Sequence, residues 1–125
     1  MILSEDEGHY IIEDCATGKM VGYFLLAGLK SPHNSVELIR IVISEKGKGF
    51  GKSSIELIKK MAFEELNAHR LWLDVKLYNT VAQNLYLSAG FVKEGILRDS
   101  LYSNGVYESM QDLSILESEY MKQTV

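Results

Sequence analysis

The sequence predicts an α/β fold with a mixed, mostly antiparallel sheet, and two patterns indicate this class. Short, apolar and β-branched runs of strand length occur at both ends of the chain, and two helical patterns flank a strand in its middle. A helical crossover makes the two strands that it joins parallel, whereas direct turns make neighbouring strands antiparallel. At 125 residues, the chain is expected to form a single domain, residues 1–125, with its own core.

Three strands are predicted before the first helix. Residues Tyr10–Glu13 form a short strand, and Ala16–Lys19 has the composition of the turn that follows it. The apolar run Met20–Leu29 has strand length. The breaker Lys30–Asn34 then leads into the β-branched strand Val36–Ile43.

The first helix is predicted from Gly51 to Leu66, directly after the glycine-rich loop "EKGKGFGKSS" (Glu45–Ser54). Its apolar residues recur at four-residue spacing, which is typical of a helix with one buried face. Glu56 and Lys60 have the spacing of an ion pair on the outer face.

Further strands and a second helix are predicted in the second half of the chain. Leu71–Val75 is predicted to be a strand, and the capping-box pattern Thr80–Gln83 starts the second helix. The last two strands, Phe91–Tyr102 and Val106–Leu116, flank Asn104-Gly105, which is a strong hairpin signal.

Composition excludes several classes of partner. The net charge of −4 argues against binding to nucleic acid, which usually requires a basic surface. No apolar run is long enough to span a bilayer, so no membrane partner is expected. Cys15 is the single cysteine, which favours a reducing, cytoplasmic location and leaves no cysteine-based metal site.

The glycine-rich loop suggests a site for a diphosphate-like anion. Unpaired backbone N–H groups at a helix N-terminus attract anions, and glycines let a phosphate approach them closely. The P-loop of nucleotide triphosphatases requires a glycine where Lys46 stands, and the dinucleotide-binding fingerprint requires one at Lys52. A tight turn with solvated lysines remains the alternative that involves no ligand.

A second group of residues lies on the second helix. Asn79, Ala82 and Tyr86 have the spacing i, i+3, i+7 and therefore share one helix face. We expect Thr80 to cap the helix, which leaves the Asn79 side chain free for a ligand. In the alternative interpretation, Asn79 only starts the helix and Tyr86 packs in the core.

These motifs together resemble the GCN5-related N-acetyltransferase (GNAT) family. The family signature Gln/Arg-x-x-Gly-x-Gly/Ala is matched by Lys46–Gly51, with lysine in the first place, and the likeness continues through Asn79, "NLYLSAGF" (Asn84–Phe91) and "EGILRDSLYSNGVYESM" (Glu94–Met110). The last stretch is similar to the branch that acetylates protein N-termini, polyamines and related amines. The resemblance implies that the parallel strand pair splays around acetyl-CoA, with helices flanking the sheet.

The resemblance also implies how acetyl-CoA, the co-substrate, is held, without any metal. The backbone near Ile41, Val42 and Ile43 would pair with the pantetheine arm, and Asn79 would form a hydrogen bond with the same arm. The loop and the first helical turn would hold the pyrophosphate through Lys46, Gly47, Lys48, Gly49, Phe50, Gly51, Lys52 and Ser53.

The implied reaction is direct attack of a primary amine, from a small molecule or a peptide N-terminus, on the thioester. Tyr86 would donate a proton to the CoA sulfur, and Glu37 and Asp74 are the candidate bases. Two alternatives remain open at this point. One is a CoA-binding domain with little catalysis that acts through interaction, and the other is an unrelated nucleotide-binding domain.

The N-terminus departs from the family pattern. Family members usually begin with a strand and one or two helices before the first strand pair predicted here, and these elements form much of the acceptor wall. We expect that portion to be missing, or to be supplied by a partner chain. A sheet without its outer strand has an open edge, so we also expect a homodimer.

Overall fold

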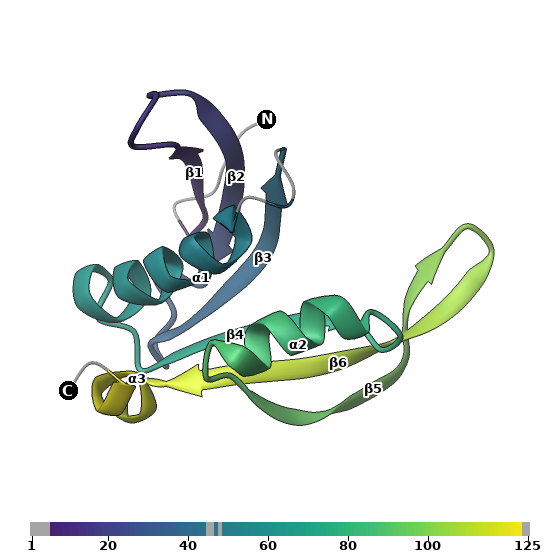
Figure 1. Ribbon diagram of the computed structural model, residues 1–125. Helices are drawn as coiled ribbons and strands as arrows, with labels where there is room; N and C mark the ends of the chain where they lie inside the picture. The colour runs from purple at the N-terminus through teal and green to yellow at the C-terminus, as the bar shows by residue number, and fades with distance from the viewer. Residues whose placement is uncertain (1–5, 45–46, 48, 124–125) are drawn as a thin grey trace.

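The structure is a computed structural model that describes residues 6–44, 47 and 49–123. Within these residues, six strands form one sheet in the order β1-β2-β3-β4-β6-β5 (Figure 1). All neighbouring strands are antiparallel except β3 and β4, which confirms the predicted mixed sheet. The strands are β1 (Gly8–Glu13), β2 (Met20–Ala27), β3 (Ser35–Ile43), β4 (Arg70–Lys76), β5 (Val92–Ser103) and β6 (Val106–Leu116).

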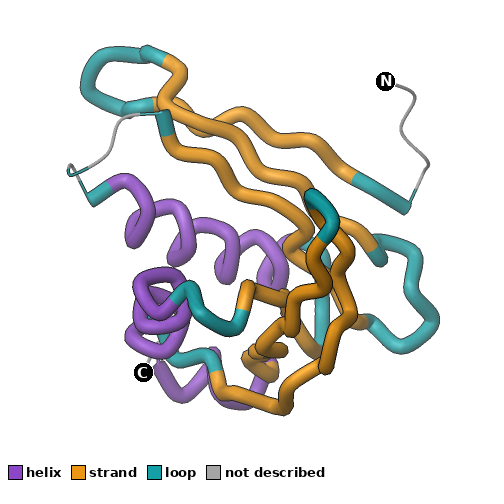
Figure 2. Tube along the Cα trace, turned by 90° about the vertical axis from the view of Figure 1, so that its right-hand side faces the viewer, coloured by secondary structure: helices purple, strands orange, loops and turns teal. Residues whose placement is uncertain are grey.

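The helices lie on one side of the sheet, as Figure 2 shows, and leave the other side open. They are α1 (Phe50–Lys60), the π-helical turn η1 (Met61–Glu65), α2 (Thr80–Ser88) and α3 (Glu117–Gln123). The core lies between the helices and the covered face, where alternate strand residues such as Val36, Leu71 and Leu113 are buried.

The parallel pair β3–β4 separates soon after it forms. Its strands pair only through Ser35–Arg70, Val36–Leu71 and Glu37–Trp72, and beyond these positions the two strands diverge (Figure 1). The antiparallel partners on either side, β2 and β6, continue to pair along both strands. The splay that the resemblance implied is therefore present at the centre of the sheet.

The first helix agrees with its prediction, with one change near its end. The last predicted turn is π-helical, since η1 continues α1 directly and ends before Leu66. Glu56 forms its ion pair with Lys59 at 3.0 Å, three residues away, and not with Lys60 as expected. Lys59 is buried, so the pair lies at the border of the core.

Two predictions about helix ends were wrong. Asn79, and not Thr80, is the N-cap of α2, because Asn79 Oδ1 accepts a hydrogen bond from the Ala82 backbone N–H at 3.1 Å. The side chain of Gln83 donates to the carbonyl oxygens of Lys76 and Leu77, so the predicted capping box does not form. In addition, α3 follows the last strand directly and was not predicted.

The hairpin at the end of the sheet has the predicted turn. Asn104 and Gly105 both have positive φ, 52° and 79°, as a tight two-residue hairpin turn requires. The tip of the hairpin projects beyond the rest of the molecule (Figure 1). Among the described residues, every helix is too short or too polar to span a bilayer.

Candidate active site

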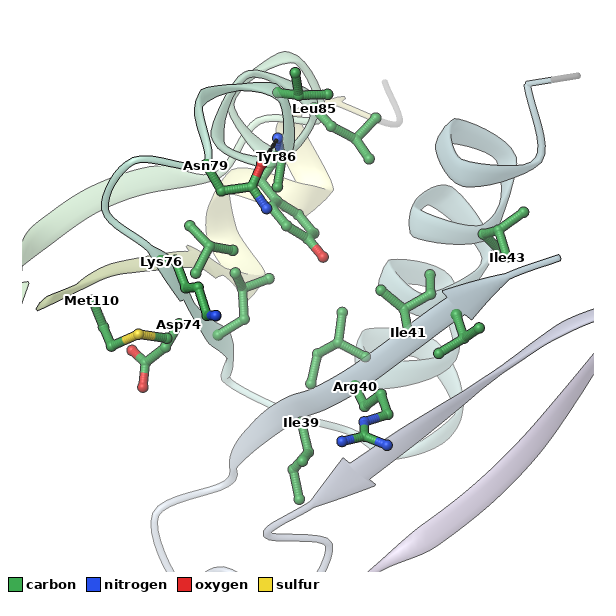
Figure 3. A pocket seen from close by; sticks show the side chains of 16 residues that line it. Ile39, Arg40, Ile41, Ile43, Asp74, Lys76, Asn79, Leu85, Tyr86 and Met110 are labelled. Carbon is green, nitrogen blue, oxygen red and sulfur yellow. Dashed lines mark hydrogen bonds between the residues drawn. The ribbon is translucent and has the colours of Figure 1, made fainter. Parts of the chain in front are cut away.

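A cavity of about 670 Å³ occupies the space between the diverging strands, beside α2. Figure 3 shows the side chains of β3 on one side of it and those of β4 and α2 on the other. The lining residues are Leu38, Ile39, Arg40, Ile41, Val42 and Ile43 from β3, Leu73, Asp74, Val75 and Lys76 from β4, Asn79, Val81, Ala82, Leu85 and Tyr86 around α2, and Met110 from β6.

The N-terminus of α1 offers backbone N–H groups for an anion. Gly47 and Gly49 both have a left-handed backbone, with φ of 78° and 75°, which is why glycine suits these positions. Gly49 is the N-cap, and no side chain of the described residues caps the helix. Ser53 N–H bonds to the Gly49 carbonyl, so the amides available to a ligand are those of the residues before Ser53 in the first turn.

The first turn of α1 has no acidic residue that would repel an anion. Of the predicted phosphate-binding residues, Phe50, Gly51, Lys52 and Ser53 belong to this turn. Lys46 and Lys48 lie outside the described residues. The described part of the predicted loop therefore has the geometry that an anion site requires.

The wall from β3 offers a strand edge. Ile41, Val42 and Ile43 line the cavity, and they pair with β2 on one side but not with β4 on the other. The edge that faces the cavity can therefore pair with an extended ligand that carries amide groups. The family resemblance implied this strand edge as the position of the pantetheine arm.

Asn79 lies at the cavity rim and has less freedom than predicted. Its Oδ1 caps α2, and its Nδ2 group remains as a donor for a ligand (Figure 3). Ala82, one turn further on, also lines the cavity with a small side chain.

Tyr86 extends from α2 into the cavity, and its hydroxyl points towards β3 (Figure 3). The residue is only 6% exposed and packs edge-to-face on Phe91, with ring centroids 5.5 Å apart. Burial raises the pKa of Tyr86 to about 12, because the phenolate would lose its hydration. A tyrosine is protonated at neutral pH even at its ordinary pKa of about 10, so the side chain is able to donate.

Three carboxylates lie on the open face of the sheet, near the point of splay. Asp74 lines the cavity and pairs across the strands with Asp112, a residue that sequence reasoning missed. Both Oδ1 atoms are buried and accept no hydrogen bond from the described part of the chain. Only the register between β4 and β6 brings Asp112 here, so the sequence contained no local signal for it.

Glu37, the other predicted base, is the last β3 residue that pairs with β4, and it does not line the cavity. Burial, followed by the nearby negative charge of Asp112, raises the pKa of Glu37 above its usual value. Among the described residues, no three His, Cys, Asp or Glu side chains are placed to hold a metal ion.

Together, a free strand edge, an open helix N-terminus and a protonated phenol define a site for an extended ligand with an anionic end. Comparison with known proteins shows the family to which the chain belongs. The family profile of the acetyltransferase (GNAT) family matches residues 1–91. The chain is also 33% identical over 119 residues to the spermidine N(1)-acetyltransferase of Vibrio cholerae. The chain therefore belongs to the GNAT acetyltransferase family, which confirms the predicted enzyme class, an acetyl-CoA-dependent N-acetyltransferase.

The relatives extend beyond the matched region. The alignment covers 94% of this chain and 68% of the Vibrio cholerae enzyme. A probable N-acetyltransferase of Bacillus subtilis, YjcK, is 33% identical over 87% of this chain but only 51% of its own length. The chain thus spans between half and about two thirds of these two curated relatives.

Solved structures show the same fold. The Vibrio cholerae spermidine N-acetyltransferase in complex with CoA and spermine has a TM-score of 0.86 and 32% identity, over 94% of this chain and 69% of that one. A dodecameric structure of the same enzyme has a TM-score of 0.87 and covers 97% of this chain and 71% of that one. The predicted splayed, mostly antiparallel GNAT fold is therefore confirmed.

Proposed function

We propose that this protein transfers the acetyl group of acetyl-CoA to a primary amine by direct attack. The observation that carries the proposal is the protonated phenol of Tyr86 inside the cavity between the splayed strands. The free edge of β3 supports binding of the pantetheine arm, and the N-terminus of α1 supports binding of the pyrophosphate.

In this reaction the amine nitrogen forms a bond with the thioester carbon, and the bond from that carbon to sulfur breaks. The nitrogen loses a proton to a base or to water, and the departing thiolate gains one. The Tyr86 hydroxyl supplies the hydrogen bond and the proton for the sulfur, and it regains a proton from solvent afterwards. Asp74 lines the cavity, and this position supports its role as the base. Glu37 does not line the cavity, so it would act through a water molecule.

A cationic amine is the acceptor that the open face supports best. Asp74 and Asp112 are partly exposed carboxylates that lie opposite each other across β4 and β6, and they can accept hydrogen bonds from an ammonium group near the cavity. The related enzyme from Vibrio cholerae is named for spermidine, and one of its structures contains spermine. A polyamine is therefore the first acceptor to test, ahead of a peptide N-terminus.

Replacement of Tyr86 by Phe tests the proposal. The variant should lower kcat by about 100-fold, which is the usual contribution of a positioned acid, while KM for acetyl-CoA changes little. Tyr102→Phe is the matched control, because Tyr102 is 62% exposed on the hairpin and should leave both constants unchanged. The assay follows release of the free CoA thiol with spermidine, spermine and N-terminal peptides.

One result would replace the proposal with its alternative. If acetyl-CoA raises the melting temperature but no amine releases CoA, the chain is a CoA-binding domain that acts through interaction. If ATP or NAD stabilises the chain and acetyl-CoA does not, both the enzyme and the CoA-binding proposals are wrong.

We also propose a cytoplasmic location and assembly into a homodimer or a larger oligomer. The free, exposed thiol of Cys15 is compatible with a reducing compartment. Support for assembly comes from the open edges of the sheet and from the relative that was solved as a dodecamer.

A further inference from the structure

Lys59 is an unusual residue for the interior of the protein. Its side chain is 2% exposed, although lysine is rarely buried unless its charge is paired. Its Nζ donates to the Ala89 carbonyl oxygen at 2.7 Å and to Gln123 Oε1 at 3.0 Å, and it lies 3.0 Å from Glu56 Oε1. An ammonium group has three donors, so all three are used.

The contact with Ala89 places the charge at the end of another helix. Ala89 is the C-cap of α2, and α2 has no basic residue in its own last turn. Free carbonyl groups and the helix dipole make a helix C-terminus negative, and a cation there is stabilising. Lys59, which belongs to α1, therefore supplies the cation that α2 lacks.

The turn that Lys59 caps is the turn that carries Tyr86. The Tyr86 carbonyl accepts hydrogen bonds from Ala89 N–H at 3.1 Å and from Phe91 N–H at 3.0 Å. The Tyr86 ring packs on Phe91, which follows the same turn. Movement of Ala89 would therefore move the backbone and the ring contact that orient the phenol.

The helix that carries Lys59 also carries the anion site, at its other end. Near the start of α1, a Cβ added to Gly51 would lie 3.8 Å from a Leu85 methyl group, so α1 and α2 also approach each other there. At the end with Lys59, the contact includes α3. A Cβ on Gly90 would lie only 1.8 Å from Gln123 Nε2. Three helices thus meet around one ammonium group.

We propose that Lys59 is a positioning residue for the proton donor. It fixes the last turn of α2 to α1, and so it sets the place of the Tyr86 hydroxyl relative to the helix whose N-terminus holds the cofactor phosphates. This inference rests on the proposed role of Tyr86, and it extends that role to a residue outside the cavity.

A double-mutant cycle tests the proposal. Lys59→Met keeps most of the side-chain volume and should lower kcat by about 10-fold or more, because small misplacements of a reacting group are costly. KM for acetyl-CoA should change by no more than about 3-fold, and Lys59→Arg should recover part of the rate. In a Tyr86→Phe background, Lys59→Met should have little further effect. An equal loss of kcat in both backgrounds would overturn the proposal.

A second measurement does not depend on activity. In protein labelled with ¹³Cζ-tyrosine, the Tyr86 resonance is assigned by its absence in Tyr86→Phe. Lys59→Met should shift or broaden this resonance and leave that of Tyr102 unchanged. An unchanged Tyr86 resonance in folded Lys59→Met would refute the positioning role. If the parent protein shows no turnover, the proposed function fails, but this spectrum still decides the question for Lys59.

Two further variants keep the test decisive if Lys59→Met does not fold. Gln123→Ala removes one acceptor from the same ammonium group and should produce a smaller shift of the Tyr86 resonance in the same direction. Lys60→Met is the matched control, because Lys60 is the next residue of α1 and its side chain is exposed. A Tyr86 resonance that responds to Lys60→Met but not to Gln123→Ala would contradict the proposal.

Discussion

Burial raises the pKa of two ionisable side chains near the site. It raises the pKa of Tyr86 to about 12, further above neutral pH than that of an ordinary tyrosine, which is itself protonated there. It also raises the pKa of Glu37, so that a carboxylate near the open face holds a proton more firmly than usual. In both residues the folded protein favours the neutral form, because the charged form has lost water.

For Glu37 this predicts a cost in stability at neutral pH. Since its pKa is higher in the folded than in the unfolded state, its contribution is fully favourable only in acid and is lost as pH rises through the folded pKa. Glu37→Gln should therefore raise Tm at pH 7 and have little effect below about pH 4, near the usual pKa of a glutamate. Thermal unfolding across this range measures the difference.

Two further variants test and control this prediction about Glu37. Asp112→Asn should change stability in the same direction, because the charge of Asp112 contributes to the shift. Glu13→Gln removes an exposed carboxylate at the end of β1 and is the control. If Glu37→Gln lowers Tm at pH 7, the Glu37 carboxylate has a stabilising partner in solution and the argument from burial is wrong.

Asp112 also permits a separate prediction about the acceptor. Asp112→Asn should raise KM for a polyamine by about 10-fold, since loss of a hydrogen bond to a charged group typically costs about 1.5 kcal/mol or more. KM for acetyl-CoA should stay the same. Equal effects on both constants would mean that Asp112 acts on the fold and not on the acceptor.

At the scale of elements, α2 is fixed at both ends by side chains. Asn79 caps its N-terminus, and Lys59 reaches its C-terminus from α1. The helix is only nine residues long, which is too short to be stable alone. Its position, and therefore that of Tyr86, depends on these contacts and on packing.

Asn79→Ala should destabilise the protein by about 1 kcal/mol through loss of the N-cap. Thr80→Ala is the matched control, and it should have almost no effect because Thr80 is the first helical residue and not the cap. Asn79→Asp keeps a capping oxygen but removes the Nδ2 donor, so it should keep stability and weaken acetyl-CoA binding. Chemical denaturation and titration calorimetry separate the two effects. A larger loss from Thr80→Ala than from Asn79→Ala would contradict the cap assignment.

At the scale of the whole molecule, the sheet is open at its centre, where β3 and β4 splay apart, and at its outer edges. The splay between β3 and β4 leaves backbone groups without a strand partner, and the proposed cofactor would pair with them. In the part of the chain that the structure describes, the outer edge of β1 also has no strand partner, and its residue Ile11 is 66% exposed. Such edges favour pairing with another chain.

We therefore expect Ile11→Lys to prevent self-association through β1, because a lysine on an edge strand opposes pairing. Sedimentation at tens of micromolar should show a dimer or larger species for the parent chain and a monomer for the variant. Val106→Lys is the control at the hairpin tip, where Val106 is 58% exposed. A monomeric parent chain would refute the assembly, and dissociation by Val106→Lys alone would move the interface to the hairpin.

The sequence by itself determined the strands, the first two helices and the glycine-rich helix start, because these depend on local periodicity and turn residues. It also indicated Tyr86 and Asn79 through their spacing on one helix face. Only the tertiary structure decided which side chains meet across elements. The pairing of Asp74 with Asp112 depends on the register of β4 and β6, and two of the three partners of Lys59 lie 30 and 64 residues further along the chain. The spacing predicted an exposed Glu56–Lys60 pair, but Glu56 pairs with Lys59, which packing buries. A buried charge is costly unless it is paired and hydrogen-bonded, which explains the several acceptors around Lys59.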